Sequence, residues 1–179
     1  NTYHKLVVRV RDEIVCFGER VDLKNKGFHI IPSNLKEQLD RKEDVVMLDV
    51  RNDYEFEVGK FKDAITLPIN NFREFSQQVS QIKDLKDKRV IMYCTGGVRC
   101  EKASAYLKEQ GFKNVSQLEG GIINFVDQYP DTYFEGSCFV FDDRKTSKVS
   151  SITISNCTIC SGKTNQMINC HNLDCDKLF

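Results

Sequence analysis

Residues 90–100 read Val-Ile-Met-Tyr-Cys-Thr-Gly-Gly-Val-Arg-Cys. The apolar run that ends at Tyr93 predicts a buried strand, and the pattern from about Glu101 onward predicts a helix. Cys94 therefore follows the carboxyl end of a strand, in a loop that opens a helix. Parallel α/β sheets place their binding and catalytic residues at such points. This stretch predicts an α/β fold with a reactive cysteine at one edge of its sheet.

The loop after Cys94 contains groups that favour a thiolate. Gly96 and Gly97 allow positive φ, so the loop can curve around the sulfur without Cβ clashes. Backbone N–H groups and the helix N-terminus attract negative charge, and Arg99 adds a positive charge. We predict that Cys94 is the catalytic thiol. The other residues of this active-site loop are Thr95, Gly96, Gly97, Val98, Arg99 and Cys100.

The size of the loop narrows the chemistry. Four residues separate Cys94 from Arg99, which is a shorter loop than that of a cysteine phosphatase and fits a sulfur atom better than a phosphate. The alternative is a core cysteine beside a glycine turn, because free cysteines are often buried. Cys100 is either a resolving thiol for Cys94 or a core residue on the following helix.

Composition sets broad limits on function. The chain has 179 residues, which suggests one main domain with additions. Its 26 basic and 26 acidic residues give a formal net charge of zero, so no overall charge points to nucleic acid. No apolar run approaches the roughly 18 residues of a membrane helix, and we expect no membrane partner. No nucleotide-cofactor, flavin or iron-ligand motif is visible.

Apolar runs alternate with helical patterns between residues 33 and 129. The continuous run at 45–50 is typical of a strand buried on both faces. This alternation predicts a parallel sheet flanked by helices, with right-handed crossovers. The predicted strands are 45–50, 64–67, 89–93, 115–118 and 138–141, and the predicted helices begin near Ser33, Asn52, Asn71 or Ser76, Arg99 and Gly120.

The first 30 residues predict a short β segment. Apolar alternation at 6–10 and a second run at 13–17 suggest one or two strands. They either end an earlier domain or pack as a pair on the main domain. At the other end of the chain, the polar stretch 142–155 predicts a linker.

The eight cysteines are unevenly distributed. A secreted disulfide scaffold would spread its cysteines through a small chain with little core. We therefore expect reduced cysteines and a cytoplasmic protein. Four cysteines near the C-terminus have spacings that suit a structural zinc: Cys157, Cys160, Cys170 and Cys175. His171 is a substitute ligand, and the alternative is a tail of reduced thiols or adventitious disulfides.

Several stretches resemble one family. The loop resembles the rhodanese active-site loop, whose cysteine carries sulfur as a persulfide. Residues 48–51, followed by Tyr54-Glu55, Gly59 and Ala64, resemble the first rhodanese signature, with Lys60 in place of a common histidine. More narrowly, the chain resembles the rhodanese-like tRNA uridine hydroxylases over residues 1–179. The stretches that carry this resemblance are 94–103, 49–55, 72–75, 118–122, 139–142 and the cysteine-rich tail.

The resemblance implies oxidation of the tRNA wobble uridine to 5-hydroxyuridine, with molecular oxygen as co-substrate. Cys94 is then the essential thiol, held as thiolate or persulfide by Arg99 and the loop N–H groups. Asp49 and Arg51 are implied to orient the loop through an ion pair, or else form a purely structural salt bridge. The implied organisation is an end of a ferredoxin-like domain with a linker (1–30), a rhodanese-like domain (31–142), and a linker with a cysteine-rich tail (143–179).

Two other functions stay open on the residues themselves. A sulfurtransferase would take sulfane sulfur onto Cys94, from thiosulfate or another sulfur donor, and pass it to a thiol acceptor. A non-catalytic binding or redox-sensing module would need no thiol chemistry. The candidates for RNA contact, each also readable as ordinary surface, are Lys60, Lys62, the run 83–89, Arg144, Lys145 and Lys148.

Overall fold

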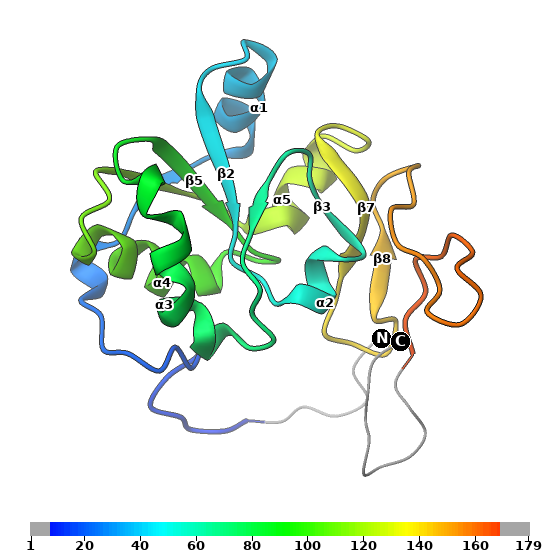
Figure 1. The fold of residues 1–179 in the computed structure, drawn as a ribbon, viewed down its shortest axis with the longest axis horizontal. Coiled ribbons are helices and arrows are strands. Elements are labelled where there is room, and N and C mark those ends of the chain that lie inside the picture. Colours follow the sequence, from blue (N-terminus) through cyan, green and yellow to red (C-terminus); the bar gives the residue numbers. More distant parts are fainter. Residues whose placement is uncertain (1–7, 169–179) are drawn as a thin grey trace.

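The computed structural model describes residues 8–168 of the 179-residue chain. Its centre is a five-stranded sheet with the order β1-β6-β5-β2-β4 (Figure 1). Every neighbouring pair in this sheet is parallel, which confirms the predicted α/β class. The strands are β1 (Phe28–Ile30), β2 (Val45–Asp49), β4 (Ile65–Thr66), β5 (Arg89–Tyr93) and β6 (Asn114–Leu118).

Two hydrophobic cores lie on opposite faces of this sheet, because successive residues of a strand point to opposite sides. In β5, Val90 and Met92 belong to one core, whereas Ile91 and Tyr93 belong to the other. Helix α4 and the η2–α3–η3 segment cover the first core, and α1 and α5 cover the second. The helices are η1 (Leu23–Asn25), α1 (Pro32–Asp40), α2 (Asp53–Phe56), η2 (Phe72–Glu74), α3 (Phe75–Gln78), η3 (Val79–Leu85), α4 (Val98–Glu109) and α5 (Gly121–Gln128).

A smaller antiparallel sheet lies beside the main one, in the order β3 (Gly59–Phe61), β7 (Phe134–Phe139) and β8 (Thr146–Lys148). Gly59 and Gly136 face each other in it. A Cβ atom on Gly59 would lie 2.2 Å from the carbonyl oxygen of Ser137, so only glycine permits this close approach. Phe61 and Phe134 pack edge to face and join the second core. The small sheet is thereby fixed to the main one.

The N-terminal segment differs from the prediction. No strand forms over residues 8–17, and Val10 and Ile14 are exposed. Phe17 anchors the segment, because its ring is fully buried and its centroid lies 5.1 Å from that of Phe72. The Lys102 ammonium also binds the Glu13 carboxylate and the Val15 carbonyl oxygen, each over 2.8 Å. The predicted strands are therefore wrong for the described residues, because alternation makes a strand only where a neighbour offers free backbone groups.

The other differences between the predicted and the observed elements concern short strands and the start of one helix. Phe28–Ile30, within the predicted linker, is the edge strand β1 paired with β6. Strand β3 was not predicted, β7 begins at Phe134 in place of 138, and β8 lies inside the predicted polar linker. Helix α1 starts at Pro32 with Ile31 as its N-cap, in place of Ser33. Proline favours the first helical position because it has no N–H group to leave unpaired.

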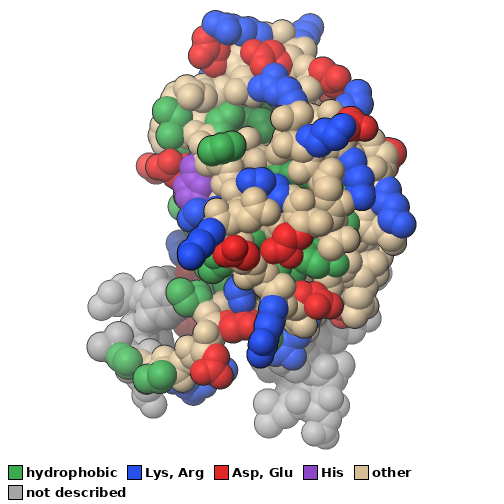
Figure 2. Space-filling model, turned by 90° about the vertical axis from the view of Figure 1, so that its left-hand side faces the viewer, with side chains coloured by type: hydrophobic (Ala, Val, Ile, Leu, Met, Phe, Trp, Pro, Cys, Tyr) green, Lys and Arg blue, Asp and Glu red, His purple; other side chains and the backbone are tan. Residues whose placement is uncertain are grey.

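Charged side chains are mixed on the surface. On the face shown in Figure 2, basic and acidic groups are interspersed, in keeping with the net charge of zero. Within residues 8–168, no helix is both long enough and apolar enough to cross a membrane.

The predicted strands at 45–50 and 89–93 and the helices that open near Arg99 and Gly120 are confirmed.

Candidate active site

Cys94 lies directly after β5, and its side chain is almost completely buried. The backbone N–H of Gly97 donates a hydrogen bond to the Cys94 sulfur over 3.1 Å. Gly97 can turn the chain in this way because its φ is 89°, a conformation that favours glycine. The loop therefore curves around the sulfur, as its two glycines predict.

The surroundings of Cys94 favour the thiolate. A hydrogen bond from the Cys100 thiol, the charge of Arg99 and backbone N–H groups together lower the pKa of Cys94 to about 6, against the opposing effect of burial. Burial raises the pKa of Cys100 well above its usual value. At neutral pH the site therefore contains one thiolate and one neutral thiol. Of the two alternatives for Cys100, the core placement is the one observed, since its side chain is fully buried in the first core.

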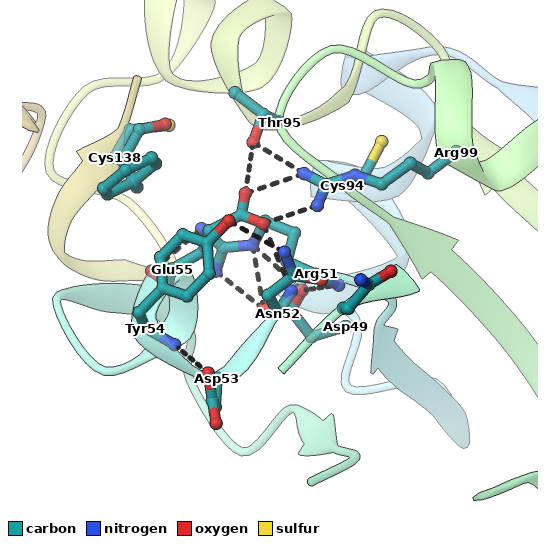
Figure 3. Close-up of polar contacts among 12 residues, drawn as sticks. Asp49, Arg51, Asn52, Asp53, Tyr54, Glu55, Cys94, Thr95, Arg99 and Cys138 are labelled. Atoms are coloured by element: carbon teal, nitrogen blue, oxygen red, sulfur yellow. Dashed lines mark hydrogen bonds and ion pairs between the residues drawn. The ribbon is translucent and has the colours of Figure 1, made fainter. Parts of the chain in front are cut away.

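The side chain of Arg99 is directed at Glu55 of α2 (Figure 3). Its Nη2 atom lies 2.7 Å from Glu55 Oε1 and 3.2 Å from the hydroxyl oxygen of Thr95. The Thr95 hydroxyl in turn donates to Glu55 Oε1 over 3.1 Å. The Arg99 side chain thus acts on Cys94 by charge at a distance, while Glu55 holds the guanidinium in place.

Glu55 is a site residue that the sequence did not reveal. It is completely buried, and its Oε2 atom also accepts a hydrogen bond from the backbone N–H of Asn52 at the start of α2. The spacing of Asn52 and Glu55 is that of a capping box, which signals a helix start and gives no hint of a partner far along the chain. Glu55 therefore has two tasks: it caps α2 and holds the arginine of the active-site loop in an ion pair.

Asp49 and Arg51 form an ion pair in which neither side chain is exposed. The Arg51 guanidinium also donates to the carbonyl oxygens of Glu55 over 3.2 Å and Gly59 over 2.6 Å. These contacts join the end of β2 to α2 and β3. The predicted pair is thus present, and it supports the loop indirectly, by fixing the helix that carries Glu55.

The start of α5 holds the other side of the loop. The backbone N–H groups of Ile122 and Ile123 donate to the carbonyl oxygens of Cys94 over 3.0 Å and Thr95 over 3.1 Å. Gly121 permits this contact, because a Cβ atom there would lie 2.4 Å from the Cys94 carbonyl oxygen. The loop is therefore fixed between two helices, α2 and α5.

Cys157 and Cys160 lie in a tight turn that suits a metal ligand pair. The Cys157 N–H donates to the Gly162 carbonyl over 2.8 Å, and the Ser161 N–H donates to the Cys157 carbonyl over 2.9 Å. Hydrogen bonds from the backbone N–H groups of Cys160 and Ile159 lower the pKa of Cys157. The other predicted ligands, Cys170 and Cys175, and the alternative ligand His171 lie outside the described residues. The two cysteines that are described fit a zinc ion, which binds thiolates.

The predicted RNA-contact residues fall into two groups. The run 83–89 lies at the end of η3 and the start of β5. The others lie on or beside the small sheet: Lys60, Lys62, Arg144, Lys145 and Lys148. The small sheet therefore gathers basic residues that are distant in the sequence.

Comparison with known proteins extends these observations. The sequence model of the rhodanese-like domain matches residues 32–128, and that of the rhodanase C-terminal region matches residues 135–179. Over 182 residues, the chain is 45% identical to a tRNA uridine(34) hydroxylase of Cytophaga hutchinsonii, with 99% of this chain and 58% of the relative covered. It is 40% identical to a protein of the same name from Protochlamydia amoebophila, covering 100% of this chain and 58% of that one. The chain thus spans about 58% of the length of these relatives.

Solved structures agree with the fold. The rhodanese-like domain of an Anabaena protein superimposes with a TM-score of 0.51 at 25% identity, covering 60% of this chain and 78% of that one. A Bacillus halodurans protein gives a TM-score of 0.50 at 25% identity, covering 62% and 77%. A cysteine loop at the carboxyl edge of a parallel sheet, and a family match over most of that sheet, lead to one conclusion: the chain belongs to the rhodanese-like domain family.

Proposed function

We propose that this chain is the catalytic part of a tRNA hydroxylase that converts the wobble uridine to 5-hydroxyuridine, with Cys94 as its essential thiol. The observation that carries the proposal is the similarity to tRNA uridine(34) hydroxylases over 99% of the chain. The Cys94 site supports it, because the thiol is ionised near neutral pH and a buried network holds its loop.

Each element of the site has a task in this proposal. The Cys94 thiolate is the nucleophile or persulfide carrier, and the Gly97 N–H stabilises its negative charge. Arg99 supplies positive charge beside the reacting group, and Glu55 and Thr95 fix its position. Molecular oxygen is the proposed co-substrate, on the strength of the family resemblance.

The proposed partner is tRNA in the cytoplasm. The name of these relatives supports this substrate, and the basic residues of the small sheet offer a surface for phosphates.

We also propose a structural zinc in the tail, held by Cys157 and Cys160 together with Cys170 and Cys175. The turn at Cys157 supports it, because backbone N–H groups already stabilise a thiolate there.

The test uses cells that lack the full-length protein and are complemented with variants. Nucleosides from digested total tRNA are measured by mass spectrometry. Wild type and Cys16→Ser, which changes an exposed cysteine outside the site, should restore the 5-hydroxyuridine-derived nucleosides. Cys94→Ser should restore none, because a hydroxyl is not ionised at neutral pH.

Unchanged nucleosides in the deletion, with no redundant pathway, would remove the hydroxylase proposal. The sulfurtransferase alternative then makes its own demand: a persulfide on Cys94 after incubation with thiosulfate, detected by mass spectrometry of the intact protein. Restoration by Cys94→Ser would contradict a catalytic role of the Cys94 thiol in either activity, as a non-catalytic binding module requires.

A further inference from the structure

Phe141 is a large apolar side chain at the margin of the active site. It follows β7, and 60% of its surface is exposed to solvent. The guanidinium carbon of Arg99 lies 5.7 Å from the centre of its ring. Arg99 belongs to the Cys94 loop and contacts the Thr95 hydroxyl. The exposed ring therefore borders the loop that holds the reactive thiol.

The position of this ring is fixed by its neighbours. Phe139 contacts it edge to face, with 5.2 Å between ring centroids, and Phe139 in turn contacts Tyr54 of α2 at 5.1 Å. The chain that carries it is also constrained, because the Val140 N–H donates to the Lys145 carbonyl over 2.8 Å. A ring held in this way loses little conformational freedom when a ligand stacks on it.

Exposed aromatic rings beside arginine have a known partner chemistry. Proteins that bind single-stranded RNA stack its bases on aromatic rings and on guanidinium planes. The Arg99 guanidinium lies over the Phe141 ring, so a base that stacks on this ring extends an existing guanidinium–ring contact, which an aliphatic partner cannot do. The β7–β8 connection also carries Lys145, and Lys148 ends β8; their charges suit the phosphates that flank a base.

We propose that Phe141 is the stacking platform for the target uracil, and that the ring, together with Arg99, positions this base at Cys94. The proposal rests on the proposed function and deepens it, because it names the residue that holds the base. Phe141 is a positioning residue in this scheme. The unpaired base lies on the exposed face of the ring, and Cys94 performs the chemistry.

The test compares Phe141→Ala with Phe141→Tyr, which keeps an aromatic ring. Phe28→Ala is the matched control: Phe28 is 81% exposed and has the Lys108 ammonium 5.7 Å from its ring centre, but it lies beside Arg89 and Asn114, at the start of β5 and β6, whereas Cys94 follows the end of β5. Full-length enzymes are assayed with an anticodon stem-loop RNA. Loss of one stacked base should raise KM roughly 10- to 100-fold in Phe141→Ala, with a smaller change in kcat. Phe141→Tyr and Phe28→Ala should resemble wild type.

A binding measurement separates this proposal from the proposed function. Each protein is titrated with two stem-loops, one with uridine at the wobble position and one abasic there. Wild type should prefer the uridine RNA, and Phe141→Ala should lose that preference. An equal loss of affinity for both RNAs, or an unchanged preference, overturns the stacking proposal even if hydroxylation is observed. A wild type that prefers uridine but never hydroxylates keeps the stacking proposal and removes the hydroxylase.

Discussion

The thiol of Cys94 is the group whose ionisation the fold controls most directly. The largest cause of its low pKa is the Cys100 thiol, which donates a hydrogen bond from inside the first core. Cys100 acts as this donor because burial keeps it protonated. The two cysteines therefore differ in their ionisation. Cys94 lies near the positive charge of Arg99, whereas burial keeps Cys100 neutral.

We therefore expect Cys100→Ala to raise the pKa of Cys94. A hydrogen bond to a charged group contributes about 1.5–3 kcal/mol, which corresponds to roughly one to two pKa units. Because the pKa of Cys94 is depressed in the folded protein, the stabilisation of its thiolate is present at high pH and is lost as the pH falls through about 6. In Cys100→Ala this loss should begin at a higher pH.

The measurement is the thiolate absorbance against pH, taken as the difference from a Cys94→Ser protein. Cys138→Ala is the matched control. Cys138 is equally buried, but its thiol donates to the Phe139 carbonyl and it belongs to the other core. A titration midpoint that moves as far in Cys138→Ala as in Cys100→Ala would show a general effect of core cavities and contradict the specific role of Cys100.

At the scale of elements, α2 and α4 are joined through one buried ion pair. Glu55 is completely buried and the Arg99 side chain is 11% exposed, so each charge depends on the other. Removal of one partner leaves an unpaired buried charge, which typically costs about 3–5 kcal/mol. We therefore expect Glu55→Gln to lower the free energy of unfolding by about this amount, measured by urea denaturation.

The control for that change is Glu37→Gln in α1. Glu37 pairs with Arg41 one helical turn away, but both side chains are more than half exposed. Exposed pairs of this kind contribute about 0.3–0.5 kcal/mol. Similar losses in the two variants would mean that the Glu55–Arg99 pair contributes no more than a surface contact.

Some of the strands and the active-site loop could be predicted from the sequence, whereas other elements could not. Strands β2 and β5 are continuous apolar runs, and Cys94 follows one of them before a glycine pair, so both strands and the loop could be predicted. Strands β1 and β3 have three residues each, too few for a periodic pattern. Glu55 and Arg99 are 44 residues apart, and a pair formed only by folding leaves no local signal.

At the scale of the whole molecule, the chain continues past β8 into a turn that lies outside both sheets. The Asn156–Lys163 bridge closes the turn that contains Cys157 and Cys160. We expect the full-length protein to bind about one zinc ion per chain through this tail. Zinc content, measured by mass spectrometry of the purified protein, should fall sharply in Cys157→Ser and Cys160→Ser.

The Cys16→Ser variant provides the comparison, because Cys16 is exposed, like Cys160, but is distant in the sequence from the cysteines of the tail. It should keep the zinc content of wild type. Equal zinc in all three variants, or none in wild type purified under reducing conditions without chelators, would contradict the proposed metal site and favour a tail of free thiols.

Arg51 gives the molecule one further property, which concerns the cooperativity of its unfolding. Arg51 follows β2 of the main sheet, but its guanidinium donates a hydrogen bond to the carbonyl oxygen of Gly59 in the small sheet. The Arg51 side chain has no exposure to water. If β3 detached alone, this permanent charge would lose a partner while still enclosed by Asp49 and the core. Separation of the small sheet from the main sheet therefore costs free energy, and we expect the two sheets to unfold as a single cooperative unit.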